Sequence, residues 1–361
     1  MIRRAGLLVT LMRPAVTVIL TMFAVVGMSG AAGQVAPLTL GRVLVVVMAG
    51  LVFAATTNDL SDEAIDRINL AGDRRRPLVV GTGTRFELKV MAGVAAGVAL
   101  SVAATLGWWP LAIATGGLAL SACYSLRPVR VADRGVVAPL FLPACYVAVP
   151  YLVGALSVRP GLSGRQVLLL VGLYLGFVGR IVLKDFRDAT GDALFGKRTF
   201  LVRHGRRAAV GFAAAFWASG AGMLTLASGA LPWSALYAAM ACGALSLLWL
   251  LAGTSDPGRE ERLIAALAIV GRGSVALVWI HLETTQARWP SAGGLAFAAA
   301  FCLITLGQGR AMATLGPRRP TGRPKALVTA GWGAAEPERL RTAPGGAGPP
   351  LGAPEPLAAH R

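Results

Sequence analysis

The chain has 361 residues, of which 55% are hydrophobic and only 14% are charged, whereas soluble domains are about a quarter charged. This composition excludes an ordinary soluble protein and predicts an integral membrane protein. The formal net charge is +18, and the 35 basic residues lie mostly in short loops and in the C-terminal tail. No basic patch is interleaved with aromatic residues. Membrane lipids, and not nucleic acid, are therefore the expected partners of this charge.

Ten uncharged or nearly uncharged segments follow one another along the chain, separated by short stretches rich in Gly, Pro or charge. Several approach the roughly 20 residues that a membrane-spanning helix needs. Small-residue pairs such as Gly93 with Gly97 and Gly172 with Gly176 allow close helix contacts. We expect an all-α fold, a polytopic transmembrane helical bundle of nine or ten spans, from the segments at residues 14–32, 43–57, 90–106, 108–125, 136–156, 166–183, 208–228, 233–252, 263–282 and 291–309.

The positions of Lys and Arg predict which side of the membrane each loop faces, because short cytoplasmic loops retain these residues. Arg3, Arg4 and Arg13 place the N-terminus in the cytoplasm. The number of spans can be nine or ten, because segment 263–282 carries Arg272 in its middle. The distribution of basic residues favours ten. We expect the protein in the cell membrane. Because successive loops lie on alternate sides of it, the charge-rich loops then face the cytoplasm, at residues 58–89, 127–134, 184–207 and 255–262.

The composition changes near the C-terminus, where Pro, Gly, Ala and Arg dominate from residue 316 onward. Such a segment cannot bury enough apolar surface to order itself. We expect a transmembrane domain at residues 1–315 and a disordered tail at residues 316–361.

An acidic cluster directly follows the second apolar segment. Asp59, Asp62 and Asp66 stand at i, i+3 and i+7, which places them on one face of a helix, with Asn58 one turn before Asp62.

A second cluster with the same spacing follows the sixth segment, at Asp185, Asp188 and Asp192, so the two clusters hold six of the nine aspartates in the chain. Like charges on one helix face repel one another, and charge at the end of an apolar segment is costly without a cation between the groups. Carboxylates without His or Cys indicate a hard ion such as Mg²⁺, whose shell substrate phosphates often complete. The clusters therefore predict one split metal site. The alternative, two solvated helix ends, is weakened by their matching spacing.

Basic residues beside the clusters are suited to hold phosphate charge. Two of the four lysines, Lys184 and Lys197, bracket the second cluster, and Arg74–Arg76 follow the first. Anchoring at the cytoplasmic face is the alternative reading of each of these residues.

Two other motifs are rejected. Residues 191–198 approach a nucleotide-binding loop, but Arg198 replaces the required Ser or Thr and a membrane span replaces the preceding strand. His204 and His281 have no Ser, Cys or carboxylate constellation around them in sequence, so a hydrolase triad has no support.

The two acidic motifs resemble the signatures of the UbiA superfamily of intramembrane prenyltransferases. Residues 58–66 match its first signature, and residues 185–199 resemble its second. Three further stretches also resemble features of the family: Arg13-Pro14, Arg76-Pro77 and the loop Tyr124-Ser125-x-x-Pro128. The resemblance spans roughly residues 13–310.

The resemblance implies a helical bundle, usually of nine spans, that transfers a prenyl group from a polyprenyl diphosphate donor to an aromatic, quinone-precursor or lipid-like acceptor. Mg²⁺ would be held by Asn58, Asp59, Asp62, Asp66, Asp185, Asp188 and Asp192. The diphosphate would be bound by Arg13, Asn58, Lys184 and Lys197. Tyr124 would stabilise the allylic cation or position the acceptor.

Two other functions remain open at this point. A membrane terpene cyclase on the same scaffold would capture the cation within the donor itself. A transporter or structural membrane protein would use the acidic loops only to bind ions.

Overall fold

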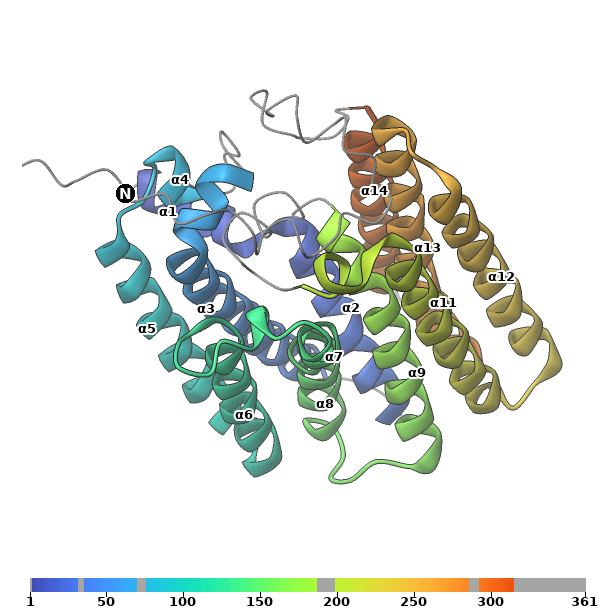
Figure 1. The fold of residues 1–361 in the computed structure, drawn as a ribbon. Coiled ribbons are helices and arrows are strands. Elements are labelled where there is room, and N and C mark those ends of the chain that lie inside the picture. Colours follow the sequence, from blue (N-terminus) through green and yellow to red (C-terminus); the bar gives the residue numbers. More distant parts are fainter. Residues whose placement is uncertain (1, 32–35, 70–75, 187–198, 286–291, 315–361) are drawn as a thin grey trace, which may run out of the picture. The chain divides into compact units, whose positions relative to one another are not determined.

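The computed structural model describes residues 2–31, 36–69, 76–186, 199–285 and 292–314, and every regular element in these ranges is helical. Each of the ten predicted segments falls on a helix or on a run of consecutive helices (Figure 1). The long elements are α1 (Ile2–Met12), α2 (Pro14–Ala31), α3 (Pro37–Asn69), α5 (Arg85–Ala104), α6 (Trp108–Ser125), α9 (Gly164–Ile181), α11 (Phe200–Ser228), α12 (Leu231–Gly253), α13 (Pro257–Thr285) and α14 (Ala292–Thr314). The short ones are α4 (Pro77–Val80), α7 (Val137–Pro143), a π-helical turn (Ala144–Ala148), α8 (Val149–Leu156) and two 3₁₀ turns (Val131–Asp133 and Val182–Lys184).

Eight helical stretches of the described chain are long and apolar enough to cross a membrane. The chain is therefore an integral, multi-pass membrane protein, as predicted. The count of nine or ten spans stays a prediction, and the tail at residues 316–361 lies outside the described residues. The eight stretches are Pro14–Ala31, Pro37–Arg67, Arg85–Ala104, Val137–Leu156, Gly164–Lys184, Phe200–Ser228, Leu231–Gly253 and Pro257–Thr285.

Local sequence explains where several helices begin. Pro14 and Pro257 are the first residues of α2 and α13, where the missing N–H of proline costs nothing. Thr84 and Ser163 cap α5 and α9 through capping boxes. Arg13, with a φ of 47°, separates α1 from α2. The two N-terminal helices therefore meet at a residue that the sequence places at the candidate site.

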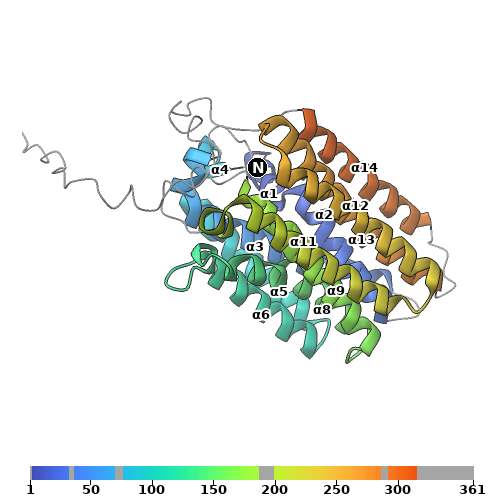
Figure 2. The ribbon, with the colours of Figure 1, turned by 45° about the vertical axis from the view of Figure 1, so that its right-hand side comes forward.

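Helix α2 has the most neighbours in the described bundle and packs against α3, α8, α9, α13 and α14 (Figures 1 and 2). On one side of α2, α3 packs against α5 and α6. On the other side, α9 pairs with α11, and α12 contacts both α11 and α13. Helix α14 packs on α13 and α2. The centre of the bundle is thus a single helix that begins at Pro14.

The crossing of α2 and α8 requires glycine. A Cβ on Gly27 of α2 would collide with the carbonyl of Tyr151 on α8, and a Cβ on Gly154 of α8 would collide with the carbonyl of Ala24 on α2. Small residues allow backbones to approach this closely in membrane helices.

The predicted small-residue contact of α9 is also present. A Cβ on Gly220 of α11 would lie 2.7 Å from Gly172 O and from Gly176 N of α9. The pair Gly93 and Gly97 makes no such contact in the described part of the chain, because no described atom lies within 4 Å of either hypothetical Cβ. These glycines are on a face of α5 that meets no helix in the described part of the chain.

The described parts of the four charge-rich loops meet at one end of the bundle, which we call the motif end. The described parts of loops predicted to share one side of the membrane therefore share one end of the fold. Two ion pairs link them, Arg130 with Asp62 and Arg206 with Glu260, and Lys184 attracts Asp66 electrostatically.

Candidate functional site

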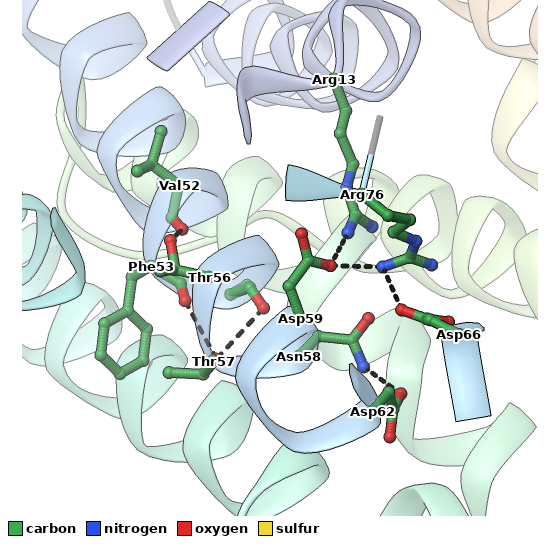
Figure 3. Close-up of polar contacts among 11 residues, drawn as sticks. Arg13, Val52, Phe53, Thr56, Thr57, Asn58, Asp59, Asp62, Asp66 and Arg76 are labelled. Carbon is green, nitrogen blue, oxygen red and sulfur yellow. Dashed lines mark hydrogen bonds and ion pairs between the residues drawn. The ribbon is translucent and has the colours of Figure 1, made fainter. Parts of the chain in front are cut away.

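The last turns of α3 carry the first acidic cluster on one continuous helix, as predicted. Asp59, Asp62 and Asp66 are only 2%, 9% and 6% exposed. Asn58 Nδ2 donates a hydrogen bond to Asp62 Oδ2 at 2.6 Å (Figure 3). This face of α3 thus points into the protein, which argues against a merely solvated helix end.

Two guanidinium groups converge on one oxygen of Asp59 (Figure 3). Arg13 Nη2, from the junction of α1 and α2, donates to Asp59 Oδ1 at 2.5 Å. Arg76 Nη1, from the residue before α4, donates to the same oxygen and lies 3.2 Å from Asp66 Oδ2. Arg76 therefore bridges two carboxylates that lie two turns apart on α3.

Arg130 neutralises the remaining carboxylate from the loop after α6. Its Nη2 donates to Asp62 Oδ1 at 2.7 Å, and its Nε donates to Asp133 Oδ2 at 2.6 Å. Burial disfavours the charged guanidinium, but the carboxylates of Asp62 and Asp133 outweigh this effect and hold the pKa of Arg130 above its ordinary value. The neighbouring carboxylates therefore stabilise the charged form of Arg130.

The second oxygen of Asp59 differs from the first, because no described residue donates a hydrogen bond to it. Asp59 Oδ2 is buried and accepts no hydrogen bond from the described residues. An isolated buried carboxylate oxygen is costly, and hard cations such as Mg²⁺ prefer such oxygens. Within the described ranges no three acidic, His or Cys side chains converge on one point as a finished metal site. The carboxylate oxygens of α3 nevertheless fit a divalent ion, and Asp59 Oδ2 is the oxygen best suited to bind it.

Only the start of the second cluster lies in the described residues. Lys184 is exposed in the 3₁₀ turn after α9, and Asp185 follows it half-buried. The charge of Lys184 interacts favourably with that of Asp66 of the first cluster. The predicted site residues Asp188, Asp192 and Lys197 lie outside the described residues, and the complete split site stays a prediction.

Tyr124 lies in the last turn of α6, six residues before Arg130. The side chain is half-buried, and its ring stacks on that of Phe141, with 6.4 Å between centroids and 17° between planes. Helix α6 thus brings both the tyrosine and the arginine to the motif end.

Two apolar cavities flank α2. The one that we call the α3–α6 cavity measures about 520 Å³. Ala54 in its wall is one helical turn before Asn58, and Ser121 is three residues before Tyr124. This cavity therefore runs along the helices that carry the first acidic motif and the tyrosine.

The other cavity, which we call the α9–α13 cavity, measures about 560 Å³. Its wall is apolar except for a few side chains, among them Arg180 of α9 and Ser274 of α13. Arg180 lies over the Phe177 ring, with its guanidinium carbon 5.5 Å from the centroid. The cavity thus offers apolar surface with a cation at its wall.

His281 belongs to a separate polar cluster and not to a hydrolase triad. Its Nε2 lies 3.0 Å from Arg165 Nη2, and its Nδ1 lies 2.8 Å from the Tyr237 hydroxyl. Because arginine can only donate, Nε2 accepts and the proton sits on Nδ1. Trp233 stacks on the ring. The histidine is therefore held neutral by its neighbours, which supports the rejection of a triad.

Sequence reasoning does not single out Arg130 as a site residue. It lies 68 positions from Asp62, and its only signal is its place two residues after Pro128 in the tyrosine loop. Arg76 is easier to identify from the sequence, because the pair Arg76-Pro77 is part of the family resemblance.

The fold and the site together define a class: a multi-pass helical membrane protein whose buried carboxylates and arginines meet at one end of the bundle. The model of the UbiA prenyltransferase family matches residues 19–270, and the chain belongs to this family. The predicted resemblance is thereby confirmed, as is the class of enzyme, a prenyltransferase.

Curated relatives carry more specific names. The chain is 26% identical to the bacteriochlorophyll synthase 34 kDa chain of Chloroflexus aurantiacus, over 46% of this chain and 54% of the relative. It is 28% identical to digeranylgeranylglyceryl phosphate synthase of Methanopyrus kandleri, over 65% and 86%. It is 30% identical to the chlorophyll synthase of Arabidopsis thaliana, over 44% and 41%. The chain thus spans about half the length of the chlorophyll and bacteriochlorophyll synthases that it matches.

Solved structures share the fold. A structure described as digeranylgeranylglyceryl phosphate synthase aligns with a TM-score of 0.62 at 18% identity, over 79% of this chain and all of that one (100%). A UbiA homologue from Archaeoglobus fulgidus bound to GPP and Mg²⁺ aligns with a TM-score of 0.55 at 16% identity, over 85% and 99%. At these identities the likeness shows the fold alone.

Proposed function

We propose that the chain transfers a polyprenyl group from an isoprenyl diphosphate to an aromatic, quinone-precursor or lipid-like acceptor, in a Mg²⁺-dependent reaction at the cytoplasmic face of the cell membrane. The observation that carries this proposal is the buried face of α3, where three carboxylates meet three guanidinium groups. These are Asp59, Asp62 and Asp66 with Arg13, Arg76 and Arg130.

Such a face suits a metal diphosphate because it holds both kinds of group that one requires. Carboxylate oxygens bind the hard cation, and guanidinium groups bind phosphate oxygens in pairs of hydrogen bonds. Once the oxygens of Asp59 are shared with a cation, Arg13 and Arg76 become free to donate to the diphosphate, with Lys184 beside them. Asp185, Asp188 and Asp192 complete the metal ligands in this proposal, and Lys197 the phosphate ligands.

The proposed reaction is an alkyl transfer. The allylic C–O bond of the donor breaks, its electron pair leaves with the diphosphate, and the allylic carbon bonds to a nucleophilic atom of the acceptor, which then loses a proton. When bound, Mg²⁺ supplies neutralisation of the charge on the leaving diphosphate. Arg13, Arg76 and Lys184 supply the rest of that neutralisation from fixed positions. The ring of Tyr124 faces the developing cation or the acceptor.

The α3–α6 cavity is the proposed place of the prenyl chain. The cavity of about 520 Å³ is lined mainly by apolar side chains, and its wall includes Ala54, one turn from Asn58. A chain in this cavity leaves its diphosphate at the acidic motif. The homologue solved with GPP and Mg²⁺ supports a diphosphate donor, and relatives named for bacteriochlorophyll and for a lipid phosphate favour a membrane-soluble acceptor.

The test uses purified protein with Mg²⁺, a panel of prenyl diphosphates and a panel of aromatic and lipid acceptors, with mass spectrometry of the products. Asp59→Asn should reduce diphosphate release at least about 100-fold, because removal of a group that stabilises transition-state charge has this scale of effect. Asp256→Asn is the matched control, since Asp256 is exposed and accepts a hydrogen bond from Arg259 N at the start of α13, which asparagine can also do.

Full turnover by Asp59→Asn would contradict the proposal. A cyclised hydrocarbon formed from geranylgeranyl diphosphate without any acceptor would instead identify a terpene cyclase on the same scaffold. Metal binding without any diphosphate release would identify the ion-binding transporter.

A further inference from the structure

A second buried arginine stands apart from the acidic motif. Arg272 lies in the middle of α13, inside a membrane-spanning stretch, and is 7% exposed. Its Nη2 donates to the backbone carbonyl of Ala15 at 3.2 Å. Its Nε is buried and has no hydrogen-bond partner among the described residues.

This placement is costly. A cation inside a membrane span normally pairs with an anion, and an unpaired one marks a binding site by default. Arg13, Arg76 and Arg130 each contact a carboxylate, whereas Arg272 contacts none in the described part of the chain. Arg272 therefore has an unmet requirement for negative charge that the other three do not have.

The neighbours of Arg272 line a cavity. Gly271, Ser274 and Val275 on the same turns of α13 form part of the wall of the α9–α13 cavity. Gly271 leaves room for Arg180, whose Cδ would lie 3.2 Å from a Cβ at that position. Arg180 in the cavity wall thus reaches the turn of α13 that carries Arg272, and two cations at this turn would attract an anion whose apolar body fits the cavity.

The same arginine is also close to the acidic motif. Ala15 is two residues after Arg13, whose guanidinium reaches Asp59. An anion at Arg272 would therefore lie near the place where the donor's diphosphate is bound, on the opposite side of α2 from the α3–α6 cavity.

We propose that Arg272 binds an oxyanion of the acceptor, a carboxylate or a phosphate monoester, while the acceptor's apolar part occupies the α9–α13 cavity. This assignment rests on the proposed function, because it presupposes a donor that ionises at the α3 motif. It makes Arg272 a determinant of acceptor class: acidic acceptors bind, and their neutral counterparts do not.

The experiment follows thermal unfolding of the full chain in detergent with two matched probe pairs. One pair is 4-hydroxybenzoate and 4-hydroxybenzamide, and the other is monooleoylglycerol phosphate and monooleoylglycerol. The pairs distinguish a carboxylate from a phosphate. A separate arm adds geranylgeranyl diphosphate with Mg²⁺. The variants are Arg272→Met, Arg272→Lys and the control Arg259→Met, which alters an exposed arginine near the start of α13.

We expect at least one oxyanion to raise the unfolding midpoint of the unaltered protein more than its neutral counterpart does. Arg272→Met should bind that oxyanion about 30-fold more weakly or worse, since truncating one partner of a buried charge pair has this effect. Arg272→Lys should retain part of the affinity, and Arg259→Met all of it. Without ligand, Arg272→Met should unfold at the same temperature or higher, because it removes an uncompensated buried charge.

Four results would overturn the assignment. The unaltered protein could show no preference for either oxyanion. The variant Arg272→Met could keep the full preference, could lose its stabilisation by the donor, or could unfold at a lower temperature than the unaltered protein without ligand. The third would place Arg272 in the donor site, and the fourth would make it a structural anchor for α2. Failure of the unaltered protein to respond to donor and Mg²⁺ would instead reject the proposed function, whatever the oxyanion result.

Discussion

Arg130 Nη2 lies 2.7 Å from Asp62 Oδ1, so the loop after α6 closes directly onto the acidic face of α3. The pair is nearly enclosed, with 12% of each side chain exposed. Its position links the tyrosine helix to the first acidic motif.

Arg130→Met should lower kcat/KM by about 10- to 100-fold and raise the Mg²⁺ concentration needed for half-maximal rate, because partners that orient metal-binding carboxylates have effects of this size. Steady-state kinetics over a Mg²⁺ titration measure both quantities. Arg134→Met is the control, since Arg134 lies in the same loop and donates to the carbonyl of Val129. An equal loss in the two variants would mean that only the loop's fold had been disturbed.

Removal of divalent metal should stop turnover and leave the protein folded. The arginines already neutralise the carboxylates of α3 in the structure, so the ion is not required to relieve their repulsion. Product assays and thermal unfolding after chelation test both parts. Restoring Mg²⁺ with donor at 100 times the dissociation constant should add about 2.7 kcal/mol of stability. Unfolding upon chelation alone would contradict this account.

Gly27→Ala should destabilise the protein by about 1–3 kcal/mol or more, because the new Cβ would collide with the backbone of α8 at Tyr151. Gly97→Ala is the matched control on α5, where no described atom lies within 4 Å. It should be neutral or stabilise by up to about 1 kcal/mol through helix propensity. Thermal unfolding in one detergent ranks the two variants, and the reverse order would refute the α2–α8 crossing.

Tyr124→Phe should keep most of kcat, whereas Tyr124→Ala should lose about 30-fold if the ring faces a developing cation, since a desolvated cation–π contact is worth about 2 kcal/mol. Phenylalanine can also keep the stacking on Phe141. Single-turnover rates separate this effect from acceptor binding. An equal loss of rate in both variants would assign the role to the hydroxyl group instead.

The sequence predicts the helices well because its signal there is local. Runs such as residues 208–228 are uncharged over most of a bilayer's thickness, and only a helix satisfies their backbone in lipid. The i, i+3, i+7 spacing of Asp59, Asp62 and Asp66 likewise predicts one face of one helix, and the structure has them on α3.

The sequence is a poorer guide to which helix faces meet. Gly93 with Gly97 and Gly172 with Gly176 have the same spacing, yet within the described residues the second pair packs against another backbone and the first does not. Spacing describes one helix, while contact depends on its rotation relative to a neighbour that is distant in the chain.

The membrane class, the helical segments and the acidic motif can be read from the sequence, because composition, hydrophobic length and helical periodicity are properties of contiguous residues. The partners of that motif depend on the fold. Arg13, Arg76 and Arg130 come from three separate segments, and the charge of a buried carboxylate is balanced by whatever the fold brings within hydrogen-bond distance. The fold also leaves Arg272 buried with no carboxylate partner among the described residues, and this requirement points to a ligand that the sequence does not name.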